Sequence, residues 1–169
     1  FRCASVASDA LIAFSTCCYA LGLYTNYTGP PYNVWFCPTT NYTGASVYVL
    51  QGKTALKAGL WYYLVGTRRG SELAIYVNGE LENTMTSPAP YDMTSYAPSI
   101  GRMRSGQHVL NGNIAKTQIY NRALTAEEVK VNFNMFANRL SGSGLYGTHY
   151  EYIGWTLKDI VRDNLLLCL

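Results

Sequence analysis

The chain has 169 residues, of which 49% are hydrophobic and only 14% charged, a size that suits one domain able to bury a core without disulfides or metals. The formal charge of +3 is small and its basic residues are scattered, which argues against nucleic-acid binding, since that function needs a concentrated basic stripe. No run of about 20 apolar residues occurs, so no membrane span is predicted.

The first part of the chain, residues 1–45, reads as an irregular N-terminal segment with short strands and turns, which could be the first strands of the domain. Five cysteines allow at most two internal pairs, and the lack of a CxxC pair argues against zinc. Asn26 and Asn41 each begin an N-glycosylation triplet, which predicts modification if the protein is secreted by a glycosylating host.

The middle of the chain, residues 46–140, has a clearer β pattern. Residues 47–50 indicate a strand buried on both faces, and residues 61–65 indicate a second strand. The strongest signal comes next, where residues 73–77 alternate and lead into Asn78-Gly79, the dipeptide best suited to a type I′ turn. The sequence therefore predicts a β-hairpin that returns over residues 80–84.

Downstream of the hairpin, residues 86–98 contain three prolines and indicate a long irregular loop. Residues 99–102 are expected as a short strand. Asn111-Gly112 is expected as a second tight turn that opens a strand over residues 113–120.

One helix is predicted among the strands. Thr125 and Glu128 have the spacing of a capping box at its start. An apolar stripe follows at Val129, Phe133, Phe136 and Leu140. Residues 141–169 then read as a C-terminal appendage with a possible short helix and an apolar end, which should pack against the domain or another subunit.

Taken together, five pieces in order resemble the laminin-G-like jelly roll of the concanavalin A superfamily. They are Trp61, Leu73–Leu81, Ile100–Arg102, Asn111–Ala115 and Ile119–Val129. Residues 132–134 are also similar to a helix ending found in such domains from phages and environmental sequences. The resemblance implies an all-β fold, an antiparallel β-sandwich with one short helix near residues 125–140.

The resemblance also implies where individual residues lie. Trp61 is expected in the core between the sheets, and Trp35 in a strand that introduces the first core layer. Gly101 and Gly112 are expected to allow backbone geometry that side chains would block. Arg122 and the capped helix are expected across one end of the sandwich.

The function implied by the resemblance is a non-catalytic binding module on an extracellular or virion surface, with a glycan or a cell-surface receptor as its partner. Its ligand site is expected at the loop rim, formed by Tyr91, Asp92, Tyr96 and His108. An alternative is a structural subunit of a virion, tail or extracellular filament. In that case exposed edges and tails would link the module to a second copy or to another neighbour.

A third reading, a glycoside hydrolase, needs two carboxylates that flank the scissile bond. Glu80 and Glu82 are the only candidate pair, and they follow a tight turn among solvent-type residues, which favours a solvated hairpin edge without catalysis. Calcium is a recurrent ligand of laminin-G domains, but no Asp cluster indicates a site here. No cofactor or metal is therefore predicted.

Overall fold

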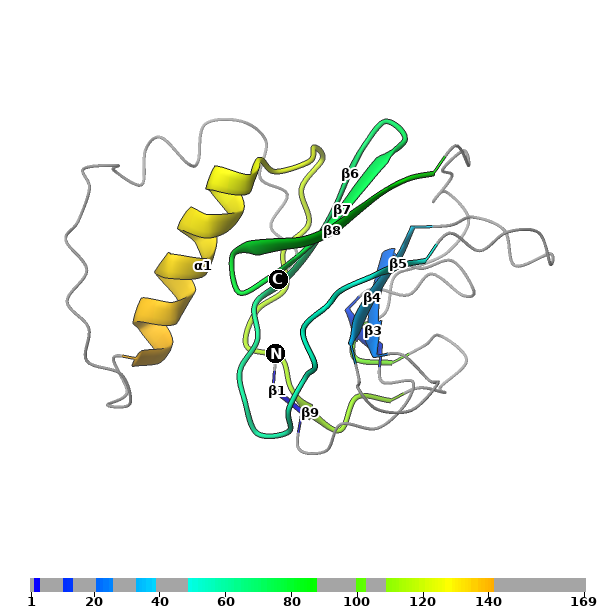
Figure 1. Ribbon diagram of the computed structural model, residues 1–169. Helices are drawn as coiled ribbons and strands as arrows, with labels where there is room; N and C mark the ends of the chain where they lie inside the picture. Colours follow the sequence, from blue (N-terminus) through cyan, green and yellow to red (C-terminus); the bar gives the residue numbers. More distant parts are fainter. Residues whose placement is uncertain are drawn as a thin grey trace.

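The computed structural model describes residues 2–3, 11–13, 21–25, 33–38, 49–87, 100–102 and 109–141. Two antiparallel sheets face each other, and a helix lies on the outer side of one of them (Figure 1). The first sheet has the order β2-β3-β4-β5, formed by β2 (Leu11–Ala13), β3 (Leu21–Thr25), β4 (Val34–Pro38) and β5 (Leu50–Gln51).

The second sheet has the order β6-β7-β8, formed by β6 (Leu64–Arg69), β7 (Glu72–Val77) and β8 (Glu80–Thr86). A separate short pair joins β1 (Arg2–Cys3) to β9 (Gly112–Asn113). The helix is α1 (Ala126–Ser141). The predicted antiparallel β-sandwich with one helix is thus confirmed, whereas the expected C-terminal helix lies outside the described residues.

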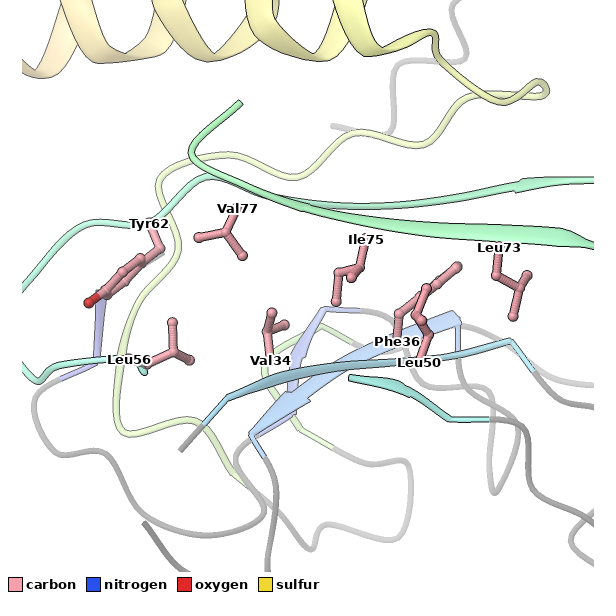
Figure 2. Packing of buried hydrophobic residues seen from close by; sticks show 8 residues of the cluster. All are labelled: Val34, Phe36, Leu50, Leu56, Tyr62, Leu73, Ile75 and Val77. Atoms are coloured by element: carbon pink, nitrogen blue, oxygen red, sulfur yellow. The ribbon is translucent and has the colours of Figure 1, made fainter. Parts of the chain in front are cut away.

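The sandwich core lies between the two sheets (Figure 2). It consists of eight buried side chains: Val34, Phe36, Leu50, Leu56, Tyr62, Leu73, Ile75 and Val77. The sheets approach closely at Gly66 of β6, where an added Cβ would lie 2.5 Å from the Phe36 ring. A glycine is therefore required at that position, because Phe36 already occupies the space of a side chain.

The predicted hairpin is confirmed. Asn78 and Gly79 have φ angles of 50° and 84°, the two positive values of a type I′ turn. The pairing of β7 with β8 shifts register within the hairpin, because Tyr76 faces Leu81 while Ile75 faces Asn83. Glu82 is consequently the extra residue of a β-bulge, which the alternating sequence pattern does not predict.

The helix begins with the predicted capping box. The Glu128 N–H donates to Thr125 Oγ1 at 3.2 Å, and the Thr125 N–H donates to Glu128 Oε2 at 2.8 Å. The helix covers the outer face of β6–β8 at the end near the hairpin turn, where Val129 is buried with Tyr76 and Leu124. Leu140 is the last position of the predicted apolar stripe, and its side chain is not among those that the structure describes.

Two tryptophans differ from expectation. Trp61 and Trp35 are only half-buried, and their neighbours fill the core instead: Tyr62 beside Trp61, and Val34 and Phe36 on either side of Trp35. Because side chains alternate along extended backbone, a neighbour in the core turns the tryptophan away from it. The strand predicted over residues 61–65 correspondingly starts later, at Leu64.

Other predicted boundaries are also corrected. Only the end of the strand predicted over residues 47–50 is described, and β5 extends one residue beyond it to the exposed Gln51. The predicted burial on both faces stays a prediction, because residues 47 and 48 lie outside the described residues. Residues 100–102 are a bend, because Gly101 has a φ of 72°, which a strand cannot contain. Gly112 lies in β9 instead of in a tight turn.

Residues 114–120 follow β9 as irregular chain instead of the predicted strand. Most of their side chains are half-buried beside β6 and α1. The apolar pattern that predicts a strand here reflects this burial, because periodic burial does not require hydrogen bonding to a sheet.

Candidate functional site

The residues expected at the loop rim, Tyr91, Asp92, Tyr96 and His108, lie outside the described residues, as do the glycosylation candidates Asn26 and Asn41. These assignments stay predictions. The candidate site is therefore built from the part of the chain that the structure does describe.

A groove runs along β6 and encloses about 530 Å³, within the range of 300–1,000 Å³ typical of ligand pockets. One wall is β6 from Leu64 to Arg68, and the other is the irregular segment 114–124. Phe133, Phe136 and Ala137 of α1 complete it. We call this feature the β6 groove. The sequence does not predict it, because its walls come from segments about 50 residues apart that only the fold brings side by side.

Several aromatic rings line the β6 groove. Trp61 and Tyr63 enter from the segment that leads into β6, and Tyr120 enters from the opposite wall. The Tyr63 ring stacks on Phe136, with centroids 5.5 Å apart and an interplanar angle of 29°. Such contacts hold rings in fixed orientations, so the groove presents a preformed aromatic surface.

The hairpin turn fixes the backbone of Tyr63. The Asn78 N–H donates to the Tyr63 carbonyl oxygen at 2.8 Å, and the Tyr63 N–H donates to Asn78 Oδ1 at 2.9 Å. This reciprocal pair requires Asn78 to hold its left-handed conformation, which asparagine tolerates better than most residues. The same dipeptide that makes the turn thereby positions one wall of the groove.

Two of the tyrosines that line the groove, Tyr63 and Tyr120, stay protonated near neutral pH. Burial raises the pKa of the Tyr63 phenol, and repulsion from an ionised Tyr120 adds to the effect. Burial likewise raises the pKa of Tyr120, whose hydroxyl oxygen accepts a hydrogen bond from Asn132 Nδ2 at 3.4 Å. Both phenols therefore remain neutral, available as hydrogen-bond donors or acceptors.

Cationic side chains also line the β6 groove. Lys116 Nζ lies 4.8 Å from the centroid of the Phe136 ring. Arg68 Nε donates to the carbonyl oxygen of Gly70 at 2.8 Å. Arg122 is held by Glu128, to which it donates two hydrogen bonds of 2.8 and 2.7 Å.

The structure separates the two carboxylates weighed as a catalytic pair. Glu80 is exposed and accepts a hydrogen bond from Lys130 Nζ of α1 at 2.8 Å. Glu82 is half-buried, and its carboxylate accepts hydrogen bonds from the N–H groups of Lys53 and Thr54, at 2.6 and 3.0 Å, and from the Thr54 hydroxyl. The expected solvated edge is thus wrong for Glu82, because the bulge directs it to the chain after β5. Neither carboxylate lines the groove.

No three His, Cys, Asp or Glu side chains gather among the described residues in a way that could hold a metal ion. No helix in the same part of the chain is long and apolar enough to cross a membrane.

Comparison with known proteins gives one family. The concanavalin A-like lectin/glucanases superfamily matches residues 4–130 of the 169. Among solved structures, the chain is similar to residues 221–444 of an S-layer domain-containing protein from Clostridium thermocellum, with 21% identity and a TM-score of 0.41. The match covers 76% of this chain and 64% of that one, so this chain spans less than two thirds of its length. No curated protein matches the sequence.

Proposed function

The chain belongs to the concanavalin A-like lectin/glucanase superfamily, and from this premise we propose that it is a non-catalytic glycan-binding module of an extracellular or cell-surface protein. The observation that carries the proposal is the aromatic lining of the β6 groove. Pyranose rings present C–H faces that pack against aromatic rings, while their hydroxyls need polar partners.

The polar partners in the β6 groove are few and placed among the rings. Asn78, Thr117 and Gln118 supply amide and hydroxyl groups, and the neutral phenols of Tyr63 and Tyr120 add to them. A mostly apolar pocket with a small number of polar groups is the usual form of a small-molecule site. This combination supports a saccharide that stacks on the rings and is oriented by hydrogen bonds.

Binding without catalysis is supported by the positions of the acidic residues. A glycosidase needs two carboxylates on either side of the scissile bond. Glu80 and Glu82 instead contact Lys130 and the Lys53–Thr54 backbone, and no Asp or Glu is among the described residues that line the β6 groove.

The test is a glycan array probed with the wild-type protein and with Trp61→Ala, which removes one ring from the groove. We expect the wild type to bind a defined set of glycans and Trp61→Ala to lose at least about tenfold in affinity, comparable to other buried aromatic contacts. Tyr91→Ala and Tyr96→Ala serve as the matched variants for the predicted loop rim.

The variants separate the two locations for the ligand. If the rim variants lose binding while Trp61→Ala keeps it, the site moves from the groove to the rim. If the wild-type protein binds no glycan on the array, the proposed function is wrong. Thermal unfolding of each variant checks that lost binding does not reflect lost folding.

The second candidate function is a structural subunit of a virion, tail or extracellular filament. The observation in its favour is that β8 ends its sheet, among the described strands, and edge strands readily accept a strand from a neighbour. Light scattering tests it. A monomer at every concentration would contradict the assembly role, whereas rings or polymers would support it.

A further inference from the structure

The outer face of the β6–β8 sheet has a second hollow, beside the start of α1. The helix lies over the end of this face near the hairpin turn (Figure 1). Next to Thr125 and Ala126, a space of about 610 Å³ lies over the sheet, again within the range typical of ligand pockets. We call this feature the sheet hollow. Its lining includes four threonines, an arginine and a glutamate, so it is more polar than the β6 groove.

The strand register arranges the polar groups of the sheet hollow in two rows. Leu73 and Ile75 point into the sandwich core, so the residues that alternate with them along β7 point to the outer face. Two of these residues have directly opposite partners on β6 and on β8, which share the same face. The rows are Thr67, Ala74 and Thr84, and Arg69, Glu72 and Thr86. They lie about 7 Å apart along the strands, which gives a flat array of hydrogen-bonding groups.

Tyr76 brings a buried hydroxyl to the same hollow. Its ring packs with Leu124 and Val129, and the residue is only 7% exposed. A tyrosine buried to this extent usually bonds its hydroxyl to a protein group. Here the hydroxyl forms no hydrogen bond with a described residue, and it is not among the side-chain atoms sealed from solvent without a partner. Its partner must therefore come from the sheet hollow, which Tyr76 lines.

The two charges in the sheet hollow have opposite signs. Arg69 and Glu72 lie directly opposite each other on β6 and β7, and neither side chain forms an ion pair or a hydrogen bond within the described part of the chain. Arg69 also attracts the carboxylate of Glu128 at longer range. An ion in the hollow would be attracted by one of the two lining charges and repelled by the other. Neutral hydroxyl groups suit the array better, because they accept from arginine and donate to glutamate.

The sheet hollow adjoins the β6 groove. Thr67, Ala123 and Leu124 line both of them. Each alone has the volume of a small-ligand site, so a ligand that fills both is longer than one small molecule. The two also differ in chemistry, since the groove offers aromatic rings and the sheet hollow offers mainly hydrogen-bonding groups. Together they suit a chain of repeated units that have both an apolar ring face and hydroxyls.

From these observations we propose that the sheet hollow is a second subsite for a neutral polysaccharide. The protein then recognises an extended segment of several sugar units, which starts in the β6 groove and crosses Thr67 and Leu124 onto the sheet. This inference rests on the proposed function and adds the length and the charge class of the ligand. It assigns the Tyr76 hydroxyl a direct hydrogen bond to the chain.

The experiment measures affinity against chain length by calorimetry. The probes are four neutral series, cello-, xylo-, manno- and laminari-oligosaccharides of two to six units. We expect at least one series to bind, with affinity that rises about tenfold or more between the shortest bound member and the hexamer. The reason is that the added units gain hydrogen bonds in the sheet hollow, each worth about two- to tenfold in affinity.

Variants that remove single polar groups test the location. Tyr76→Phe keeps the ring packed and removes only the hydroxyl, and Thr84→Val replaces a hydroxyl with a methyl group of similar size. Each should lower affinity for the hexamer about two- to tenfold and leave the shortest bound member unchanged. Trp61→Ala should instead lower affinity at every length, because Trp61 lines only the groove.

Arg69→Gln should act like the two hydroxyl variants. Its control is Lys53→Gln, which removes the same charge from an exposed position outside both hollows. Equal losses in these two variants would overturn the role of Arg69, because they would indicate only an effect of net charge. Thermal unfolding of every variant checks that the fold is kept.

The outcomes distinguish this inference from the proposed function. Affinity that does not rise with chain length, or hydroxyl variants that weaken short and long chains equally, would show that the second subsite is wrong while glycan binding stands. The same conclusion holds if none of the four series binds but the array reveals another glycan ligand. If neither the array nor the oligosaccharides show binding, both the subsite and the proposed function are wrong.

Discussion

Two apolar clusters in the described part of the chain share one strand but differ in how completely their side chains are buried. On one face of β7, Leu73 and Ile75 are 1% and 0% exposed and lie in the sandwich core. On its other face, Ala74 and Tyr76 pack toward α1 with half-buried tyrosines. The first cluster is closed by a second sheet, whereas the second is closed by a helix beside a groove.

The difference has a structural origin. The sheets meet closely because Gly66 has no side chain and Phe36 fills the space above it. The helix rests on large rings, since Phe133 lies against Gly79 and Phe136 stacks on Tyr63. The β6 groove lies beside these rings, between β6 and the segment 114–124. We infer that the sandwich core provides stability while the helix side provides binding.

The largest expected effect comes from replacing one phenylalanine in the sandwich core and, separately, one phenylalanine of α1 beside the groove. Phe36→Ala should lower the free energy of unfolding by about 3–5 kcal/mol, because Phe36 is 1% exposed in the sandwich core. Phe136→Ala should cost only about 1–2 kcal/mol, since its ring is half-buried at the groove.

Chemical denaturation of both variants measures the difference, and glycan binding is measured alongside. Only Phe136→Ala should lose affinity while most of the protein remains folded. Similar unfolding costs for the two variants would mean that the two clusters contribute equally to stability.

A second prediction concerns the close approach of the sheets. Gly66→Ala should destabilise by about 1–3 kcal/mol, because the new methyl group would lie 2.5–2.8 Å from three carbons of the Phe36 ring. The cost should fall when Phe36 is also changed to Leu, which frees space at the same contact. A double-mutant cycle tests this coupling; additive effects of the two changes would contradict the proposed contact.

A third prediction separates the two carboxylates of β8. Glu82→Ala should destabilise by about 1–2 kcal/mol, because three donors at Lys53 and Thr54 lose their charged acceptor. Glu80→Ala serves as the control and should leave stability nearly unchanged, since its partner Lys130 is exposed. Unfolding curves check both; a larger effect at Glu80 would contradict the structural role assigned to Glu82.

The sequence predicts those parts of the fold that depend on local chemistry. Asn78-Gly79 predicts the hairpin because few residues accept two positive φ angles, and Thr125 with Glu128 predicts the start of α1 because their bonds lie within one turn. Alternation along residues 73–77 predicts both faces of β7 correctly.

Features that depend on tertiary contact are not predictable in this way. Apolar alternation does not show which neighbour enters the core, and Tyr62 occupies the place expected for Trp61. The bulge at Glu82 arises from pairing with β7 and binding to the segment after β5, which local sequence does not encode. The β6 groove likewise requires two segments about 50 residues apart in the sequence to be placed side by side.

The smallest effect tests how the helix is attached. Arg122 lowers the pKa of the Glu128 carboxyl by hydrogen bonding, and burial opposes this shift only in part. A carboxyl whose pKa is lower in the folded state stabilises the fold above its ordinary pKa of 4.5, and this contribution disappears as the pH falls through the folded value. The pair is more than a third exposed, so we expect only about 0.2–1 kcal/mol.

Glu128→Gln isolates that contribution, because glutamine can still accept the capping bond from Thr125. Wild type should be more stable than the variant at pH 7, and the two should converge once the pH falls below the lowered pKa of the Glu128 carboxyl, as measured by urea unfolding at each pH. Phe36→Leu gives the contrasting case, since its cost arises from burial and should not depend on pH. The difference in the free energy of unfolding between wild type and Glu128→Gln could also prove independent of pH. The Arg122–Glu128 ion pair would then contribute nothing to stability, and the helix, like the sandwich core, would be held by apolar packing alone.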